Sequence, residues 1–196
     1  DGRELAFVAD SNPAANVVNL DVFTVPVGGK AAVNRTSTNK ASDTVPLYSP
    51  DGRWLAWGQQ RIVGFYGDIK RLMLLDRRSG AARQVVDDAW DRSAEGLAWA
   101  PNSKHLYGAI DDAGSVRVYE FPLDGKPRAV TGDESFSSLA VAADSGTLVG
   151  LRQTFVEPPT VVRIDPKSKK IAKLSRINDA LLAGTALGRY ESVTYA

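Results

Sequence analysis

The residues that could carry out catalysis are few. The sequence has one histidine, His105, and no cysteine. A serine–histidine–aspartate relay would need His105 as its base, but this residue stands where a turn meets a strand and is predicted to be an ordinary exposed strand residue. The 196 residues contain no Gly-x-Ser-x-Gly nucleophile elbow and no glycine-rich phosphate loop. We therefore predict no catalytic residue and no cofactor in this chain.

Metal binding is not indicated either. A zinc site would need several carboxylates to replace the missing cysteine and histidine ligands. The acidic run Asp87-Asp88-Ala89-Trp90-Asp91 has oxygen ligands for a hard cation, but it lacks the alternating spacing and central glycine of a calcium loop. We expect a solvated loop there, and we expect Asp51 and Asn102 to form turns.

Charge and hydropathy exclude two further classes of partner. There are 24 Lys and Arg against 23 Asp and Glu, and the basic residues do not alternate with aromatic ones. No apolar run approaches the roughly 20 residues of a membrane-spanning helix. We therefore expect neither nucleic-acid nor membrane binding. The absence of cysteine is compatible with both the bacterial periplasm and the cytoplasm.

A repeat runs through the whole sequence. A turn followed by an apolar strand recurs four times, and its leucines are spaced by 50, 51 and 42 residues. A second turn and two more short strands flank each copy, as in Val25-Pro26-Val27-Gly28-Gly29-Lys30 and Phe121-Pro122-Leu123-Asp124-Gly125-Lys126. The four copies of the first turn begin at Asp1-Gly2-Arg3-Glu4-Leu5, Asp51-Gly52-Arg53-Trp54-Leu55, Asn102-Ser103-Lys104-His105-Leu106 and Asp144-Ser145-Gly146-Thr147-Leu148.

A unit of four short strands at this period is typical of a propeller blade. We predict an all-β fold, a partial β-propeller of about four four-stranded antiparallel blades of the TolB-like or peptidase type. Residues 1–40 supply the last three strands of one blade, and three nearly complete blades follow at about 45–94, 95–135 and 136–176. Four large side chains are expected at contacts between blades: Trp57, Trp99, Tyr107 and Leu148.

Three irregular segments, 58–70, 87–95 and 152–159, are predicted to emerge on one face of the blades. Scaffold loops of unequal length on one face are where function usually resides, although plain variation in loop length is the more ordinary explanation. The candidates for contacts on the substrate side are Tyr66, Trp90, Glu95, Arg152 and Glu157.

The last segment leaves the repeat. We divide the chain into propeller blades at 1–176 and a linker with a first strand at 177–196. Residues 178–187 are expected to form a cap and a short helix, despite Gly184, and 190–195 alternate as a strand. The sequence starts without methionine and stops within this apparent strand, so we expect it to be part of a longer protein.

Three stretches carry a resemblance to a known family. They are Pro158-Pro159-Thr160-Val161-Val162-Arg163-Ile164-Asp165, Lys173-Leu174-Ser175-Arg176-Ile177-Asn178 and Gly188-Arg189-Tyr190-Glu191-Ser192-Val193-Thr194-Tyr195. They resemble the junction between the propeller and the α/β-hydrolase domain of prolyl oligopeptidase-family serine peptidases, such as dipeptidyl and acylaminoacyl peptidases. The Ser-Pro-Asp-Gly-Arg turn at 49–53 is similar to blades of that family and of TolB-type propellers.

The resemblance implies a role and partners. The propeller would restrict access of short peptides to the hydrolase active site, so the partners would be a peptide substrate and the hydrolase domain of the parent protein, whose catalytic residues would follow Ala196. Dipeptidyl peptidases hold the substrate amino terminus with two adjacent glutamates in the propeller. This sequence has no such pair, and its nearest candidates are the isolated Glu95 and Glu134.

Two other functions remain open at this point. A TolB-like propeller without a hydrolase domain would be a protein-binding module, although the 177–196 segment argues against it. A sugar-acting or lactonase propeller would need inward-facing carboxylates or a metal, and no such cluster is present. Terminal blades of an incomplete ring would expose apolar faces, so self-association through blade edges is also expected.

Overall fold

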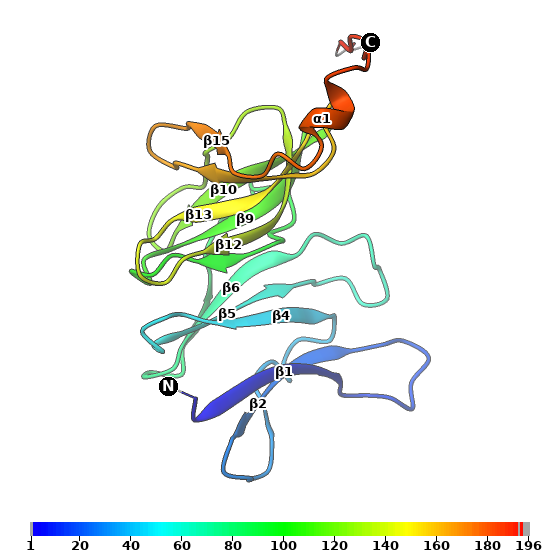
Figure 1. Ribbon diagram of the computed structural model, residues 1–196. Coiled ribbons are helices and arrows are strands. Elements are labelled where there is room, and N and C mark those ends of the chain that lie inside the picture. The colour runs from blue at the N-terminus through cyan, green and yellow to red at the C-terminus, as the bar shows by residue number, and fades with distance from the viewer. Residues whose placement is uncertain (1, 192, 194–196) are drawn as a thin grey trace.

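The computed structural model describes residues 2–191 and 193 and consists almost entirely of antiparallel sheets. The described residues form one three-stranded and three four-stranded sheets, and in each sheet the strands pair in the order in which they occur along the chain. The four sheets lie one above another, from the N-terminal sheet to the C-terminal one (Figure 1). The predicted partial propeller is therefore confirmed, including the three-stranded first blade.

The blades are numbered 1 to 4 along the chain. Blade 1 contains β1 (Glu4–Asp10), β2 (Leu20–Pro26) and β3 (Val33–Asn34). Blade 2 contains β4 (Asp43–Tyr48), β5 (Trp54–Gln59), β6 (Arg71–Asp76) and β7 (Ala82–Gln84). Blade 3 contains β8 (Ala98–Trp99), β9 (His105–Asp112), β10 (Ser115–Pro122) and β11 (Arg128–Ala129). Blade 4 contains β12 (Ser135–Val141), β13 (Leu148–Gln153), β14 (Thr160–Ile164) and β15 (Ile171–Lys173).

The repeated turn has the local chemistry that its sequence predicts. Gly52 has φ 69°, in the left-handed region that glycine adopts without strain, and Ser103 occupies the same place in blade 3 with φ 56°. The Asp51 carboxylate accepts the N–H of Arg53 at 3.0 Å, and the Asn102 side chain accepts the N–H of Lys104 at 2.9 Å. Asp51 and Asn102 are thus turn formers, as expected.

The core lies between the sheets, in three apolar clusters that each join two neighbouring blades. Side chains from alternate strand positions point to one face and meet those of the next sheet. The four large residues predicted at these contacts all lie there. Trp57 belongs to the cluster of blades 1 and 2, Trp99 to that of blades 2 and 3, and Tyr107 and Leu148 to that of blades 3 and 4.

Hydroxyl groups tie the end of the outer strand back to the sheet in three blades. A threonine or serine just after the last strand of the blade accepts the main-chain N–H of a residue in the strand before it, which would otherwise lack a partner at the blade edge. The pairs are Val22 with Thr36 (2.9 Å), Val118 with Thr131 (2.9 Å) and Val161 with Ser175 (3.0 Å).

The outward face of blade 1 is apolar and uncovered. Leu5 is 59% exposed, and Phe7 stacks on Phe23 with 5.6 Å between ring centroids on the neighbouring strand. An apolar sheet face of this kind is normally covered by another surface. Self-association through such faces stays a prediction.

The segment after β15 lies outside the four sheets over its described residues. The expected helix is present but short, because α1 spans only Asp179–Leu182, and Gly184 follows its last turn. Asn178 occupies the N-cap position without a capping side-chain hydrogen bond. Of the predicted strand 190–195, residues 190, 191 and 193 are not in a strand, and the others lie outside the described residues.

Removing a buried ring between blades should be costly. Phe121 is fully buried between blades 2 and 3, so Phe121→Ala is expected to lower the free energy of unfolding by about 3–5 kcal/mol through lost burial and a residual cavity. Phe155→Ala removes the same ring from a position that is 83% exposed and should cost less than about 0.5 kcal/mol. Urea unfolding followed by tryptophan fluorescence measures both. Equal losses in the two variants would contradict the interblade core.

Candidate functional site

The three irregular segments emerge on one face of the blades, as predicted. Strand direction alternates within a blade, so the β5–β6, β7–β8 and β13–β14 connections leave the sheets at the same end, which Figure 1 shows on the right. We call this end the loop face. The opposite end, formed by the tight β4–β5, β6–β7 and corresponding connections, is the turn face.

A buried carboxylate shapes the β5–β6 loop. Asp68 accepts the main-chain N–H groups of Arg61 (2.6 Å) and Ile62 (3.0 Å) and pairs with Arg71 at 3.2 Å. Burial alone would raise the pKa of Asp68, but these hydrogen bonds and the Arg71 charge outweigh it and hold the pKa below its ordinary value. The loop is therefore closed on itself at its base, and Tyr66 stands at its tip with 78% of its surface exposed.

Two salt bridges join this loop to the 87–95 segment. Arg61 pairs with Asp88 at 3.0 Å, and Lys70 pairs with Glu95 at 2.7 Å. The Glu95 side chain is half-exposed, and its charge is already balanced by Lys70. The acidic run is held by local partners, and the described residues contain no group of three or more His, Cys, Asp or Glu side chains that could hold a metal.

Trp90 turns toward the core. Its ring packs edge-on against Tyr119 and Phe121, with centroid distances of 5.0 and 5.7 Å, and the Arg92 guanidinium lies 5.3 Å above it. Its indole Nε1 is buried without a hydrogen-bond partner among the described residues. In this chain Trp90 is thus a packing residue of the blade 2–blade 3 contact rather than a side chain presented at the loop face.

Arg152 and Glu157 form the centre of an ion network on blade 4. Arg152 contacts Glu157 and also pairs with Glu134 at 3.3 Å. Lys173 pairs with Glu157 at 2.6 Å and contacts Asp179 of α1. The hydrogen bond from Lys173, followed by that from Arg152, keeps the pKa of Glu157 below its usual value despite partial burial. The network ties the β13–β14 loop to α1, and its carboxylates are ionised partners of cations rather than proton donors.

The predicted site residues therefore fall into two groups that the structure does not bring together. Tyr66, Trp90 and Glu95 lie on segments of blade 2 and its connection to blade 3, whereas Arg152 and Glu157 lie on blade 4. The two glutamates considered for an amino-terminus clamp are separate, because Glu95 pairs with Lys70 and Glu134 with Arg152.

Sequence reasoning missed most of the apolar character of the loop face. Ile62, Val63 and Phe65 are each more than half exposed beside Tyr66, and Phe155 lies 4.7 Å from Tyr190 of the C-terminal segment, measured between ring centroids. Several further residues of the tail share this exposure, namely Leu174, Ile177, Leu181 and Val193. The signal was present, since Ile62-Val63-Gly64-Phe65-Tyr66 is an apolar run inside an irregular segment.

The expectation that His105 is exposed was wrong. Its side chain is only 16% exposed, and its Nε2 lies 3.1 Å from the Tyr107 hydroxyl and 3.6 Å from the Glu120 carboxylate. His105 and Tyr107 are two positions apart on β9 and share the face that blade 4 covers. Burial lowers the pKa of His105, although the Glu120 charge opposes this, and burial raises the pKa of Tyr107 to about 12.

Comparisons with known proteins agree with this fold. No established family profile matches the sequence. The curated dipeptidyl-peptidase 5 of Porphyromonas gingivalis is 26% identical over 187 residues, which cover 93% of this chain and 27% of that protein. The chain thus spans about a quarter of the length of this relative.

Solved structures give the same result. The acylaminoacyl peptidase of Pyrococcus horikoshii matches 99% of this chain and 30% of its own, with a TM-score of 0.75 and 15% identity. The β-propeller domain of the trilobed protease of Pyrococcus furiosus matches 90% and 53%, with a TM-score of 0.67 and 14% identity. A TolB-type protein of Agrobacterium tumefaciens matches 88% and 61%, with a TM-score of 0.65 and 14% identity.

The fold defines the class: four consecutive blades of a β-propeller of the TolB-like and peptidase type. The curated relative is a dipeptidyl peptidase, so the resemblance of the sequence to prolyl oligopeptidase-family propellers is confirmed. The chain is similar in sequence to a dipeptidyl peptidase and in fold to the propeller of an acylaminoacyl peptidase, both of the kind that the sequence resembles. No described helix is long and apolar enough to cross a membrane.

His105 should make stability depend on pH. Because its pKa is lowered in the folded chain, the unfolded chain binds the proton more readily. The contribution of neutral His105 to the free energy of unfolding is fully present above the unfolded pKa of about 6.5, and it is lost as the pH falls below that value. Urea unfolding between about pH 7 and pH 5 should show a smaller loss of stability in His105→Gln than in the unchanged chain. Identical pH dependence in both proteins would contradict the effect of burial on His105.

Proposed function

We propose that this propeller segment covers the active site of a serine-peptidase hydrolase domain in the full-length protein and admits short peptides to it. The observation that carries the proposal is the loop face, which exposes apolar side chains on blade 2, on blade 4 and on the C-terminal segment. The tips of the β5–β6 and β13–β14 loops present Phe65, Tyr66 and Phe155 to the exterior. A surface of this kind is typical of one that another protein surface covers.

The path of the chain supports the same arrangement. β15 runs toward the loop face, and the following segment continues there through α1 (Figure 1). Lys173 at the end of β15 holds Asp179 of α1, and Tyr190 contacts Phe155. We therefore propose that residues 177–196 link the propeller to a hydrolase domain seated over the loop face. The relative of about four times this length has room for such a domain.

The proposed site residues have different roles in this arrangement. Tyr66 and Glu95 lie where a peptide entering between the domains would pass, and they supply an aromatic surface and a carboxylate paired with lysine. Arg152 and Glu157 position the β13–β14 loop through their ion network. Since each loop-face glutamate considered has a cationic partner, we do not assign a clamp for a free substrate amino terminus to this segment.

The full-length protein should discriminate substrates by length. A propeller over the active site admits a chromogenic dipeptide or tetrapeptide more readily than a peptide of about 30 residues, and the ratio of kcat/KM values is expected to exceed about 100-fold. The 196-residue chain alone is the control and should hydrolyse neither substrate, since it has no nucleophile elbow. Equal cleavage of short and long peptides by the full-length protein would overturn the gating role. An absence of any hydrolase domain would favour the TolB-like binding module.

Covering of the loop face should be visible by chemical labelling. In the full-length protein, hydroxyl-radical oxidation at Tyr66 and Phe155 should be several-fold lower than their exposures of 78% and 83% in this chain imply. Val27 on the turn face, which is 58% exposed, serves as the control and should react in proportion to its exposure. Strong oxidation of Tyr66 and Phe155 would show that the hydrolase domain sits elsewhere.

A further inference from the structure

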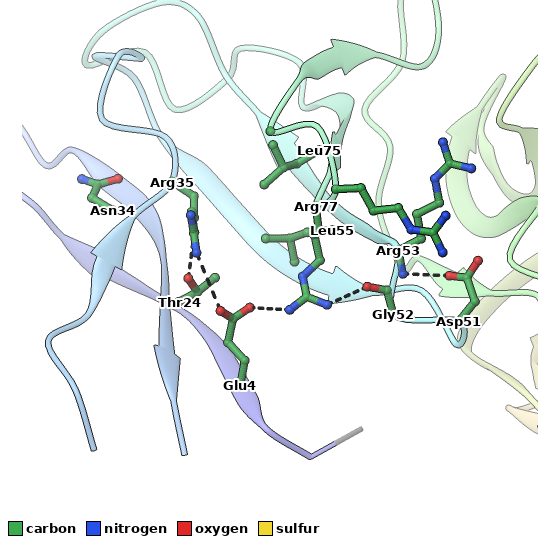
Figure 2. A pocket seen from close by; sticks show the side chains of 12 residues that line it. Glu4, Thr24, Asn34, Arg35, Asp51, Gly52, Arg53, Leu55, Leu75 and Arg77 are labelled. Carbon is green, nitrogen blue, oxygen red and sulfur yellow. Dashed lines mark hydrogen bonds and ion pairs between the residues drawn. The ribbon is translucent and has the colours of Figure 1, made fainter. Parts of the chain in front are cut away.

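A concave site lies on the turn face, away from the loop face. It is a cavity of about 590 Å³ between blades 1 and 2 (Figure 2). Four arginines line it, Arg35 from the end of blade 1 and Arg53, Arg77 and Arg78 from the turns of blade 2. We call it the arginine cavity. Its volume is in the range of small-molecule sites.

Two of its guanidinium groups are held in place by aromatic rings. The Arg77 guanidinium lies 4.7 Å from the centre of the Tyr48 ring, and it donates to the Gly52 carbonyl oxygen at 2.6 Å. The Arg53 guanidinium lies 4.4 Å from the Trp54 ring. Stacking on a ring restricts a long side chain without using all of its N–H donors. The groups are therefore pre-oriented by rigid turns.

The cavity already holds one carboxylate between two arginines. Figure 2 shows Glu4 between Arg35 and Arg77, with ion-pair distances of 3.7 and 2.9 Å. Tyr48 also donates its hydroxyl hydrogen to Glu4 at 2.5 Å. An anionic group is thus already placed between two guanidinium groups of this cavity.

The remaining charges leave positive charge in excess. Arg53 pairs with Asp76 at 2.8 Å, and the Asp51 carboxylate is engaged by Ser49 and by the main chain of its own turn. Among the described residues, no ion pair or side-chain hydrogen bond involves the Arg78 guanidinium. Four arginines thus face three carboxylates, and Arg78 is the cation that these carboxylates leave over.

We propose that the arginine cavity binds a small, multiply charged anion through phosphate or carboxylate groups. Arg78 and the N–H donors of Arg53 that Asp76 leaves unused form the primary contacts, and the charges of Arg35 and Arg77 add attraction. Guanidinium groups bind both kinds of oxyanion in a bidentate manner. The cavity opens on the face opposite the proposed hydrolase domain, so this site goes beyond the proposed function and does not depend on it.

Isothermal titration of the full 196-residue chain tests the proposal. Inorganic phosphate and citrate are the two probes, titrated separately at low ionic strength, and saturable one-to-one binding of at least one is expected. The tighter of the two distinguishes a phosphate from a carboxylate ligand. Binding should weaken on raising the salt to about 0.15 M, because a partly open site is screened.

Substitutions of single arginines test whether the preferred probe binds in the arginine cavity. Arg78→Gln should weaken the preferred probe about tenfold or more, as expected for the loss of one charged hydrogen-bonding group. Arg163→Gln is the matched control, because it removes one exposed arginine from β14 on blade 4, and it should change affinity by less than about twofold. Arg53→Gln is a second test and should also weaken binding.

If neither probe binds saturably at low ionic strength, the arginines serve only to join blades 1 and 2. If Arg163→Gln weakens binding as much as Arg78→Gln does, the attraction is that of the overall charge and not of the cavity. Arg78 is exposed, so its substitution is not expected to unfold the chain. A circular dichroism spectrum of each variant verifies this.

Discussion

Everything in this molecule depends on the covering of one sheet face by the next. A short antiparallel sheet with an apolar face is not stable alone in water. Leu74, Leu106 and Phe121 are completely buried where blades 2 and 3 meet, and each of the other two junctions has its own buried cluster. Because stability resides between the sheets, the connections at the two ends of the strands are free to take other roles.

The connections at the turn face and at the loop face differ in structure. On the turn face, the tight connections are determined by Asx-type hydrogen bonds and left-handed residues, and they also link blades, as where the Asp51 N–H donates to Ser103 at 3.0 Å. On the loop face, the β5–β6 and β13–β14 connections are longer and present the exposed aromatic side chains Phe65, Tyr66 and Phe155. One end is consequently rigid and rich in arginine, whereas the other is apolar. A scaffold with two such different ends can engage two different kinds of partner.

Much of the fold could be predicted from the sequence because its signals are local. A turn such as Asp51-Gly52-Arg53 and the leucine that follows it recur in each blade, so the number and order of strands follow from the repeat. The side-chain partners could not be predicted in this way. Glu4 and Arg77 are 73 positions apart, and their contact depends on how two sheets stack. For the same reason the burial of His105 under blade 4 was not foreseen.

The candidate site was predicted only in outline. The sequence indicated which segments are irregular and that they share an end of the sheets. It did not indicate that Trp90 turns inward or that Arg152 and Glu157 neutralise each other, because these outcomes depend on packing against Tyr119 and on charges from β15. The length of α1 depends on Gly184 and on the lack of a capping bond at Asn178, which are small local energies.

Each apolar cluster of the core contains residues of only two neighbouring sheets, and this has an evolutionary consequence. A protein built from nearest-neighbour contacts can gain or lose a whole repeat by duplication or deletion, provided that the two newly adjoining faces fit. Here the leucines of the repeated turn are 51 residues apart between blades 2 and 3 but only 42 apart between blades 3 and 4, and the sheets still stack in the same way. Insertions can therefore be accommodated in the connections, and a solved structure that is only 15% identical keeps the same fold. Ring size and loop length become traits that vary independently.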